Sequence, residues 1–228
     1  MTTNKVLTED LGKIFEMALC LYYEIDYDGH YKYSLQEAQI LKNKLSNLKS
    51  VFPYAIKHCA KGGSKYDFEC IDDPTIHLSA KTTKKDGKVC PQVIGQPSRK
   101  KFCEFFALDP HSASLDQIKT FIINNIAHML TVYCTHTFDC PLLYYNNHSN
   151  KLAFIVYKEH INWSNSTIQF SHNIKNKLWN ESSSISINGV TIGEFQVHNN
   201  RDCIKFRWCF EKLLAMFGQH FTIVDLTL

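Results

Sequence analysis

The chain has 228 residues, 44% of them hydrophobic, and a formal net charge of +3 at pH 7. A chain of this length and composition buries a sizeable core, and we expect a single domain over residues 1–228. A charge of +3 does not by itself indicate a nucleic-acid partner. No run of about 18 apolar residues occurs, which argues against a membrane span.

The cellular compartment is indicated by the first residues and by the cysteines. MTTNKVLTEDLGKIF carries acidic residues where a signal peptide is basic and then apolar. Nine cysteines without a small-domain framework are typical of a reducing compartment. We therefore expect a soluble, cytoplasmic protein without disulfides. CTHTFDC, with Cys134, His136, Asp139 and Cys140, has the spacing of no common zinc site and is interpreted as an apolar strand that carries thiols.

The first half of the chain alternates helices with one hairpin. Apolar residues at spacings of three and four predict a helix from Thr8 to about Tyr22, and a second, capped by Ser34, continues to about Lys49. KYDFECI and TIHLSAKT, separated by the turn residues 72–74, are predicted to form a β-hairpin. SLDQIKTFIINNIAHML then predicts a helix over residues 114–130, capped by Ser114.

The second half is predicted to consist mainly of strands: TVYCTHTF, PLLYYNN, KLAFIVYK, TIQFSH, SISINGV, EFQVHN and CIKFRWCF. This order predicts an α/β or α+β fold with a mixed sheet. Within the single domain, residues 8–130 are expected to form a catalytic core and residues 131–228 a strand-rich part that recognises DNA.

The predicted hairpin places an acid beside a lysine. Side chains alternate between the faces of a strand, so an odd number of turn residues puts Asp67 on the face of Ser79 and Lys81, and a three-residue turn sets it opposite Ser79. A carboxylate binds a hard divalent cation, and an ammonium beside it can orient water near a phosphodiester. The alternative is an ordinary surface hairpin with a strand-end acid and a solvated lysine.

This stretch resembles the PD-(D/E)XK nuclease superfamily, and within it the type II restriction endonucleases. Asp67 stands in the place of the first acid and Ser79-Ala80-Lys81 in that of the (D/E)XK tripeptide. The resemblance implies a restriction-endonuclease-like core, with a mixed central sheet flanked by helices. It also implies Mg²⁺, held by Asp67 with Glu16 or Glu69, and a water positioned by Lys81. Tyr66 replaces the motif's proline and Ser79 its second acid, which leaves the number of metals open.

Two further regions are candidates for DNA contact. Basic residues gather after the hairpin, and a phosphate backbone could lie along Lys84, Lys85, Arg99 and Lys100. Gln96, in a constrained turn between Gly95 and Pro97, is a separate candidate for positioning water or phosphate, with an ordinary loop residue as the alternative. The predicted hairpin at residues 194–208 is rich in side chains that read base edges, and a two-stranded ribbon fits the major groove. Its candidates are His198, Asn199, Asn200, Arg201, Lys205 and Arg207. The alternatives are a solvated basic loop and the polar outer face of a half-buried strand pair.

The sequence thus predicts a Mg²⁺-dependent, sequence-specific endonuclease acting on double-stranded DNA. A two-fold homodimer suits a palindromic site. The sequence contains no GxxxxGK[ST] loop, so we expect no nucleotide cofactor. Two other interpretations stay open, namely a non-catalytic nucleic-acid-binding module on a nuclease-like scaffold and a structural or interaction protein with an incidental basic loop.

Overall fold

The computed structural model describes residues 8–59, 64–84, 87–90, 94, 98–175 and 177–227. The chain divides into two compact units that alternate along the sequence. Unit 1 takes in the described residues of 1–86, 140–157 and 221–228, and unit 2 those of 87–139 and 158–220. Among the described residues, no helix is both long and apolar enough to cross a membrane.

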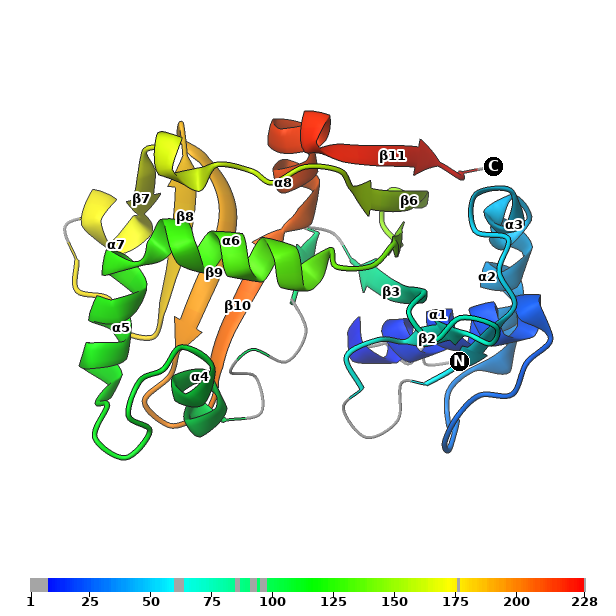
Figure 1. Ribbon diagram of the computed structural model, residues 1–228, viewed down its shortest axis with the longest axis horizontal. Helices are drawn as coiled ribbons and strands as arrows, with labels where there is room; N and C mark the ends of the chain where they lie inside the picture. The colour runs from blue at the N-terminus through cyan, green and yellow to red at the C-terminus, as the bar shows by residue number, and fades with distance from the viewer. Residues whose placement is uncertain are drawn as a thin grey trace, which may run out of the picture. The chain divides into compact units, whose positions relative to one another are not determined.

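Unit 1 is built on a mixed sheet (Figure 1). Its helical elements are α1 (Thr8–Tyr23), α2 (Leu35–Lys42), the 3-10 turn η1 (Asn43–Leu45) and α3 (Leu48–Val51). Its strands are β1 (Ile56–His58), β2 (Phe68–Cys70), β3 (His77–Thr83), β5 (Leu142–Asn146), β6 (Lys151–Tyr157) and β11 (Phe221–Asp225). The strand order is β1-β2-β3-β5-β6-β11, and only β3 and β5 of these neighbours run parallel.

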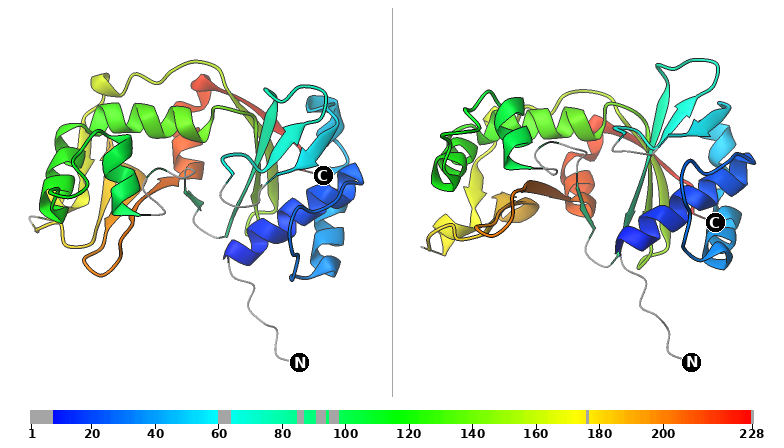
Figure 2. Two further views of the ribbon diagram at one scale, coloured as in Figure 1. Left: turned by 60° about the horizontal axis from the view of Figure 1, so that its bottom comes forward. Right: turned by 90° about the horizontal axis from the view of Figure 1, so that it is seen from below.

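Helix α1 covers one face of this sheet (Figure 2). Its apolar residues at spacings of three and four, among them Ile14, Phe15 and Ala18, are buried. They pack in one core with Leu78 and Ala80 of β3. The predicted first helix is therefore confirmed, and it fixes which face of β3 is buried beneath it.

The second predicted helix is interrupted. Ser34 caps it as predicted, since its hydroxyl accepts the backbone N–H of Glu37 at 3.2 Å. However, α2 ends at Lys42 and is followed by the turn η1 and by α3. Asn and Ser compete for backbone hydrogen bonds inside a helix, and such residues lie at the interruption. The apolar stripe continues across it in the buried Leu41, Leu45 and Leu48, and this continuity predicted an unbroken helix.

Unit 2 contains a separate sheet whose strand pairs are all antiparallel. Its strands are β4 (Lys88–Val89), β7 (Ile168–Phe170), β8 (Ser182–Ile187), β9 (Val190–Val197) and β10 (Ile204–Cys209), in the order β4-β10-β9-β8-β7. Its helical elements are α4 (Arg99–Phe105), α5 (Leu115–Asn124), α6 (Ile126–Thr137), η3 (Trp163–Asn165), α7 (Ser171–Ile174), α8 (Phe210–Phe217) and η4 (Gly218–His220). A mixed α/β architecture is confirmed, with two sheets in place of one central sheet.

The largest error of the sequence analysis concerns residues 131–138. They were predicted as a strand, but residues 131–137 form the second half of α6 and Phe138 is its C-cap, and the predicted helix at 114–130 is divided between α5 and α6. The β-branched and aromatic residues of TVYCTHTF favour a strand by propensity. Tertiary packing decides otherwise: the Tyr133 ring lies 4.6 Å from that of Phe206, and Trp208 Nε1 donates to Thr137 Oγ1 at 3.0 Å. The buried positions of α6 recur every three or four residues, as a helix requires.

The strand-rich second half contributes to both units. Strands β5, β6 and β11 fall in the part predicted to recognise DNA, yet they extend the sheet that carries β2 and β3. The remaining strands of that half belong to unit 2. The candidate catalytic hairpin and the candidate DNA-reading hairpin therefore lie in different units.

Candidate active site

The β2–β3 hairpin has the predicted register. Phe68 lies opposite Leu78, and continuing the register by one residue puts Asp67 opposite Ser79. The turn is longer than predicted, because Cys70 and Ile76 are the last residues joined by a backbone hydrogen bond, which leaves residues 71–75 as the turn. Five residues, like three, are an odd number, so the predicted parity is kept.

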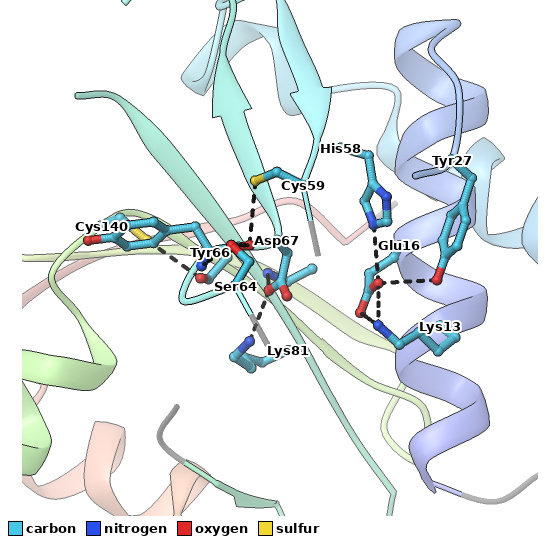
Figure 3. A network of polar contacts seen from close by, with 12 residues as sticks. Lys13, Glu16, Tyr27, His58, Cys59, Ser64, Tyr66, Asp67, Lys81 and Cys140 are labelled. Carbon is cyan, nitrogen blue, oxygen red and sulfur yellow. Dashed lines mark hydrogen bonds and ion pairs between the residues drawn. The ribbon is translucent and has the colours of Figure 1, made fainter. Parts of the chain in front are cut away.

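Asp67 and Lys81 meet in the structure (Figure 3). Strand β2 does not extend far enough for its backbone to pair with Ala80. The Asp67 carboxylate replaces the missing backbone acceptor, since its Oδ2 accepts the Ala80 backbone N–H at 2.8 Å and also the Lys81 ammonium at 2.9 Å. The two side chains are only 12% and 17% exposed. Among the described residues, Oδ1 takes part in no hydrogen bond, so this oxygen can accept a cation or a water.

Ser79 occupies the position of the missing second acid. Its side chain is buried, and its hydroxyl accepts a hydrogen bond from the Cys140 thiol at 3.6 Å. Tyr66, which stands where the motif has proline, stacks on His77 with ring centroids 3.7 Å apart. At the position of the second acid, the structure thus has a buried hydroxyl that contacts a thiol.

Glu16 lies in a polar cluster between α1 and β1 (Figure 3). Its carboxylate accepts from Lys13 Nζ at 2.8 Å and from His58 Nε2 at 3.2 Å. The Asp28 backbone N–H donates to His58 Nδ1 at 2.9 Å, so the proton of a neutral imidazole lies on Nε2 and points to Glu16. The Tyr27 ring stacks on His58.

The cluster keeps Glu16 ionised. Burial by itself raises the pKa of the Glu16 carboxyl, but the hydrogen bonds from His58 and Lys13 outweigh it and the net pKa is lowered. No hydrogen bond or ion pair among the described residues joins Glu16 to Asp67 or Lys81. Register gives the same picture, since His58, Phe68 and Leu78 share the face that α1 covers, whereas Asp67 has the opposite parity.

Glu69 pairs across the sheet with both of its neighbours. Lys57 lies opposite it on β1 and His77 on β3, at 2.8 Å and 3.9 Å from the carboxylate. The hydrogen bond from Lys57 lowers the pKa of Glu69. Glu69 is engaged in these two pairs, and no ion pair or hydrogen bond of the described residues joins it to Asp67 or Lys81.

The fit to a divalent cation can be judged from these positions. Within the described part of the chain, no group of three or more His, Cys, Asp or Glu side chains is placed to hold a metal. Mg²⁺, however, keeps several waters and is often held by one or two carboxylates together with substrate phosphate. The available oxygen of Asp67 fits that kind of site, and a cage of three carboxylates does not fit.

The candidates for DNA contact in unit 2 converge on one pocket. A cavity of about 310 Å³ lies at the tip of the β9–β10 hairpin. It is lined by Arg99, Leu115, His198, Asn199, Asn200, Arg201 and Asp202. Arg99 is held there by its backbone N–H, which donates to the Asp202 carbonyl at 2.9 Å. Two segments proposed separately from sequence thus form one surface.

Three other DNA-contact candidates in the structure are more dispersed. Lys84, in unit 1, lines a groove of about 580 Å³ with Lys44 and Asn147. Lys100 is mostly exposed on α4, with Glu104 at 3.8 Å. Lys205 is half-buried on β10. Lys85 and Gln96 lie outside the described residues.

Arg207 is tied to a carboxylate that the sequence analysis did not single out. Glu194 lies opposite it on β9, and its buried carboxylate accepts from Arg207 at 3.0 Å, from Lys88 at 2.6 Å and from Gln196 at 2.9 Å. Burial alone raises the pKa of Glu194, but the bonds from Lys88, Gln196 and Arg207 outweigh it and lower the pKa. The alternation in EFQV and KFR was the available signal, because it puts these side chains on one face.

One curated protein is similar along nearly the whole chain. The type II restriction enzyme CviAII of Paramecium bursaria Chlorella virus 1 is 43% identical over 222 residues, which are 97% of this chain and 64% of that enzyme. The chain thus spans slightly less than two thirds of the relative's length. No family model and no solved structure matches the chain. Because the similarity extends over 97% of the chain, it covers both the β2–β3 and the β9–β10 hairpins.

Proposed function

We propose that this chain is a Mg²⁺-dependent, site-specific endonuclease of double-stranded DNA, a type II restriction enzyme of the PD-(D/E)XK superfamily with a restriction-endonuclease-like core in unit 1. The observation that carries the proposal is the 2.9 Å contact between Asp67 and Lys81, side chains 14 residues apart that β2 and β3 bring together. The similarity to a restriction enzyme supports the same conclusion.

Lys81 has the central role in hydrolysis. Its ammonium has three donors, one of which binds Asp67, and the others can hold a water oxygen in line with a backbone phosphorus. Attack by that water forms a P–O bond and breaks the bond to a sugar oxygen, which leaves as a hydroxyl. Lys81 also stabilises the negative charge that develops during the attack.

Asp67 has two roles, and each of its carboxylate oxygens performs one of them. Oδ2 fixes the Lys81 ammonium and the β3 backbone, and Oδ1 is the proposed ligand of Mg²⁺. When bound, Mg²⁺ neutralises charge on the phosphate. Glu16 is ionised and held by His58 and Lys13, and Glu69 is paired with Lys57, so we assign neither of them a step in hydrolysis.

DNA contact is assigned to unit 2. The hairpin-tip pocket brings Arg99, Arg201 and the amides of Asn199 and Asn200 into one surface, which supplies both phosphate-binding and base-reading groups. A homodimer would present two such surfaces to a palindromic site, which light scattering of the free and DNA-bound protein tests.

The test is cleavage of long duplex DNA with Mg²⁺ or with chelator. Asp67→Asn and Lys81→Met should abolish discrete fragments. Lys57→Met is the matched control, because it too removes a lysine that pairs with a carboxylate on the same sheet, at 2.8 Å, and this lysine is 58% exposed. Loss of cleavage in all three variants would refute the assignment of the centre.

Ser79 in place of the second acid favours one alternative, a non-catalytic nucleic-acid-binding module. That function predicts DNA binding by the wild-type protein with no cleavage at any Mg²⁺ concentration, and no effect of Asp67→Asn on binding.

A further inference from the structure

The Glu194 cluster, made of Glu194, Lys88, Gln196 and Arg207, lies on the polar face of the unit 2 sheet. Arg207 is directly opposite Glu194, and Lys205 is directly opposite Gln196. The other face of the same strands carries Phe195 and Phe206, which pack on α6. The polar face therefore carries pairs of opposed polar side chains that take no part in the hydrophobic core.

The carboxylate at the centre of the cluster is saturated with donors. Glu194 is 7% exposed and accepts hydrogen bonds from a lysine, an arginine and an amide. Such a buried ionic group contributes little net stability compared with apolar residues of similar volume. It does fix the geometry of its partners, because each long side chain is held at its polar end.

The partners keep donors to spare. Two cations face one carboxylate, so the cluster has a net charge of +1. A guanidinium has five N–H donors, and within the described residues only Nη2 of Arg207 is engaged; Nε is buried with no hydrogen-bond partner. The donors available to an acceptor of a ligand are the N–H groups of Nη1 and Nη2 that Glu194 does not use. Arg207 and Lys88 are 31% and 39% exposed, so a ligand can reach them.

We infer that the Glu194 cluster reads a guanine in the DNA site, with Arg207 as the reading residue and Glu194 as a positioning residue that fixes its orientation. The inference rests on the proposed function. A planar fork held in one orientation matches the O6 and N7 acceptors of guanine in the major groove. A phosphate contact needs charge but not this fixed orientation, and Glu194 cancels half of the charge that a phosphate would use.

The test compares specificity in four proteins. The cleavage site is first read from the fragment ends made by the wild-type protein. The ratio of kcat/KM for that site to kcat/KM for sites differing in one base pair is then measured for wild type, Glu194→Gln, Arg207→Lys and Glu159→Gln. Glu159→Gln is the control, because it removes one negative charge from a mostly exposed position in the same unit. Affinity for an unrelated duplex is measured in parallel as a function of salt.

Opposite changes are expected for specific and non-specific DNA. Glu194→Gln should lower kcat/KM at the cleavage site about tenfold, since loss of orientation removes part of a base contact. Affinity for unrelated DNA should rise or stay equal, because one negative charge is gone. A misfolded variant would instead lose both kcat/KM at the cleavage site and affinity for unrelated DNA. Arg207→Lys, which keeps the charge, should show the same loss of specificity, and replacing one guanine of the site by 7-deazaguanine should affect wild type but not Arg207→Lys.

Three results would overturn the inference. The first is a cleavage site without a G·C pair. The second is an unchanged specificity ratio in both Glu194→Gln and Arg207→Lys. The third is an equal loss on all sequences by Arg207→Lys, with a salt slope smaller by about one, which would show a phosphate contact. If the wild-type protein cuts no DNA, the proposed function fails, and that result is distinct from these three.

Discussion

The contact between Asp67 and Lys81 allows stability and catalysis to be separated by a double-mutant cycle. Asp67 Oδ2 accepts two hydrogen bonds, at 2.8 Å from Ala80 and at 2.9 Å from Lys81, in a site where both charged side chains are less than a fifth exposed. Hydrogen bonds to charged groups contribute about 1.5–3 kcal/mol each. Asp67→Asn keeps an oxygen for Ala80 but loses the charge, so a cost of about 2 kcal/mol in the free energy of unfolding is expected.

Lys81→Met leaves the Ala80 bond intact and removes the ammonium. Its expected cost is about 1–2 kcal/mol, because the Asp67 charge then lacks its partner. The double variant should be more stable than the sum of the two losses predicts, with a coupling of about 1 kcal/mol. Urea unfolding followed by circular dichroism measures all four proteins.

Cleavage should behave differently from stability. Each single variant is expected to lose at least about a hundredfold in rate, and the double variant should be no slower than the worse single one, since the two residues act as one unit. Additive stability effects together with wild-type cleavage by Lys81→Met would refute the assigned role of this pair.

Three further predictions concern other parts of the molecule. Glu16 has a lowered pKa in the folded protein, so its stabilisation is complete above its ordinary pKa of about 4.5 and is lost as the pH falls through the lower folded value. Unfolding measured between pH 6 and pH 3 should be less pH-dependent in Glu16→Gln than in wild type, and equal slopes would contradict the cluster. Gly193→Ala should lower stability by about 1–3 kcal/mol, because a Cβ there would lie 2.7 Å from the buried Phe206 ring, whereas Gly218→Ala, with open space around it, should be neutral in the same thermal melts. Arg201→Gln should weaken binding to all duplexes and reduce the slope of log affinity against log salt by about one; an unchanged slope would remove Arg201 from the DNA surface.

Local patterns were sufficient where a single rule decides. The helix caps at Ser34 and Ser114 were predictable, because a serine before an apolar stripe satisfies exposed N–H groups wherever the helix packs. The meeting of Asp67 with Lys81 was predictable for a similar reason, since strand parity and an odd turn leave one arrangement. The β9–β10 hairpin and its turn followed from alternation and from Asn-Asn-Arg-Asp.

Tertiary structure decided what depends on partners distant in sequence. Residues 131–137 are helical because one face of α6 packs on aromatic residues of unit 2, whereas propensity alone favoured a strand. Glu16 was assigned to the site from its helix, but its partner His58 comes from a strand 42 residues away. Glu194 could be placed on a face by alternation, yet only the packed sheet shows that Lys88, 106 residues earlier, reaches its carboxylate. The sequence by itself determines which residues share one face of a strand or helix, because that follows from the local periodicity. Which charged side chains are buried and paired depends on how the helices and strands pack together, and only the tertiary structure shows this.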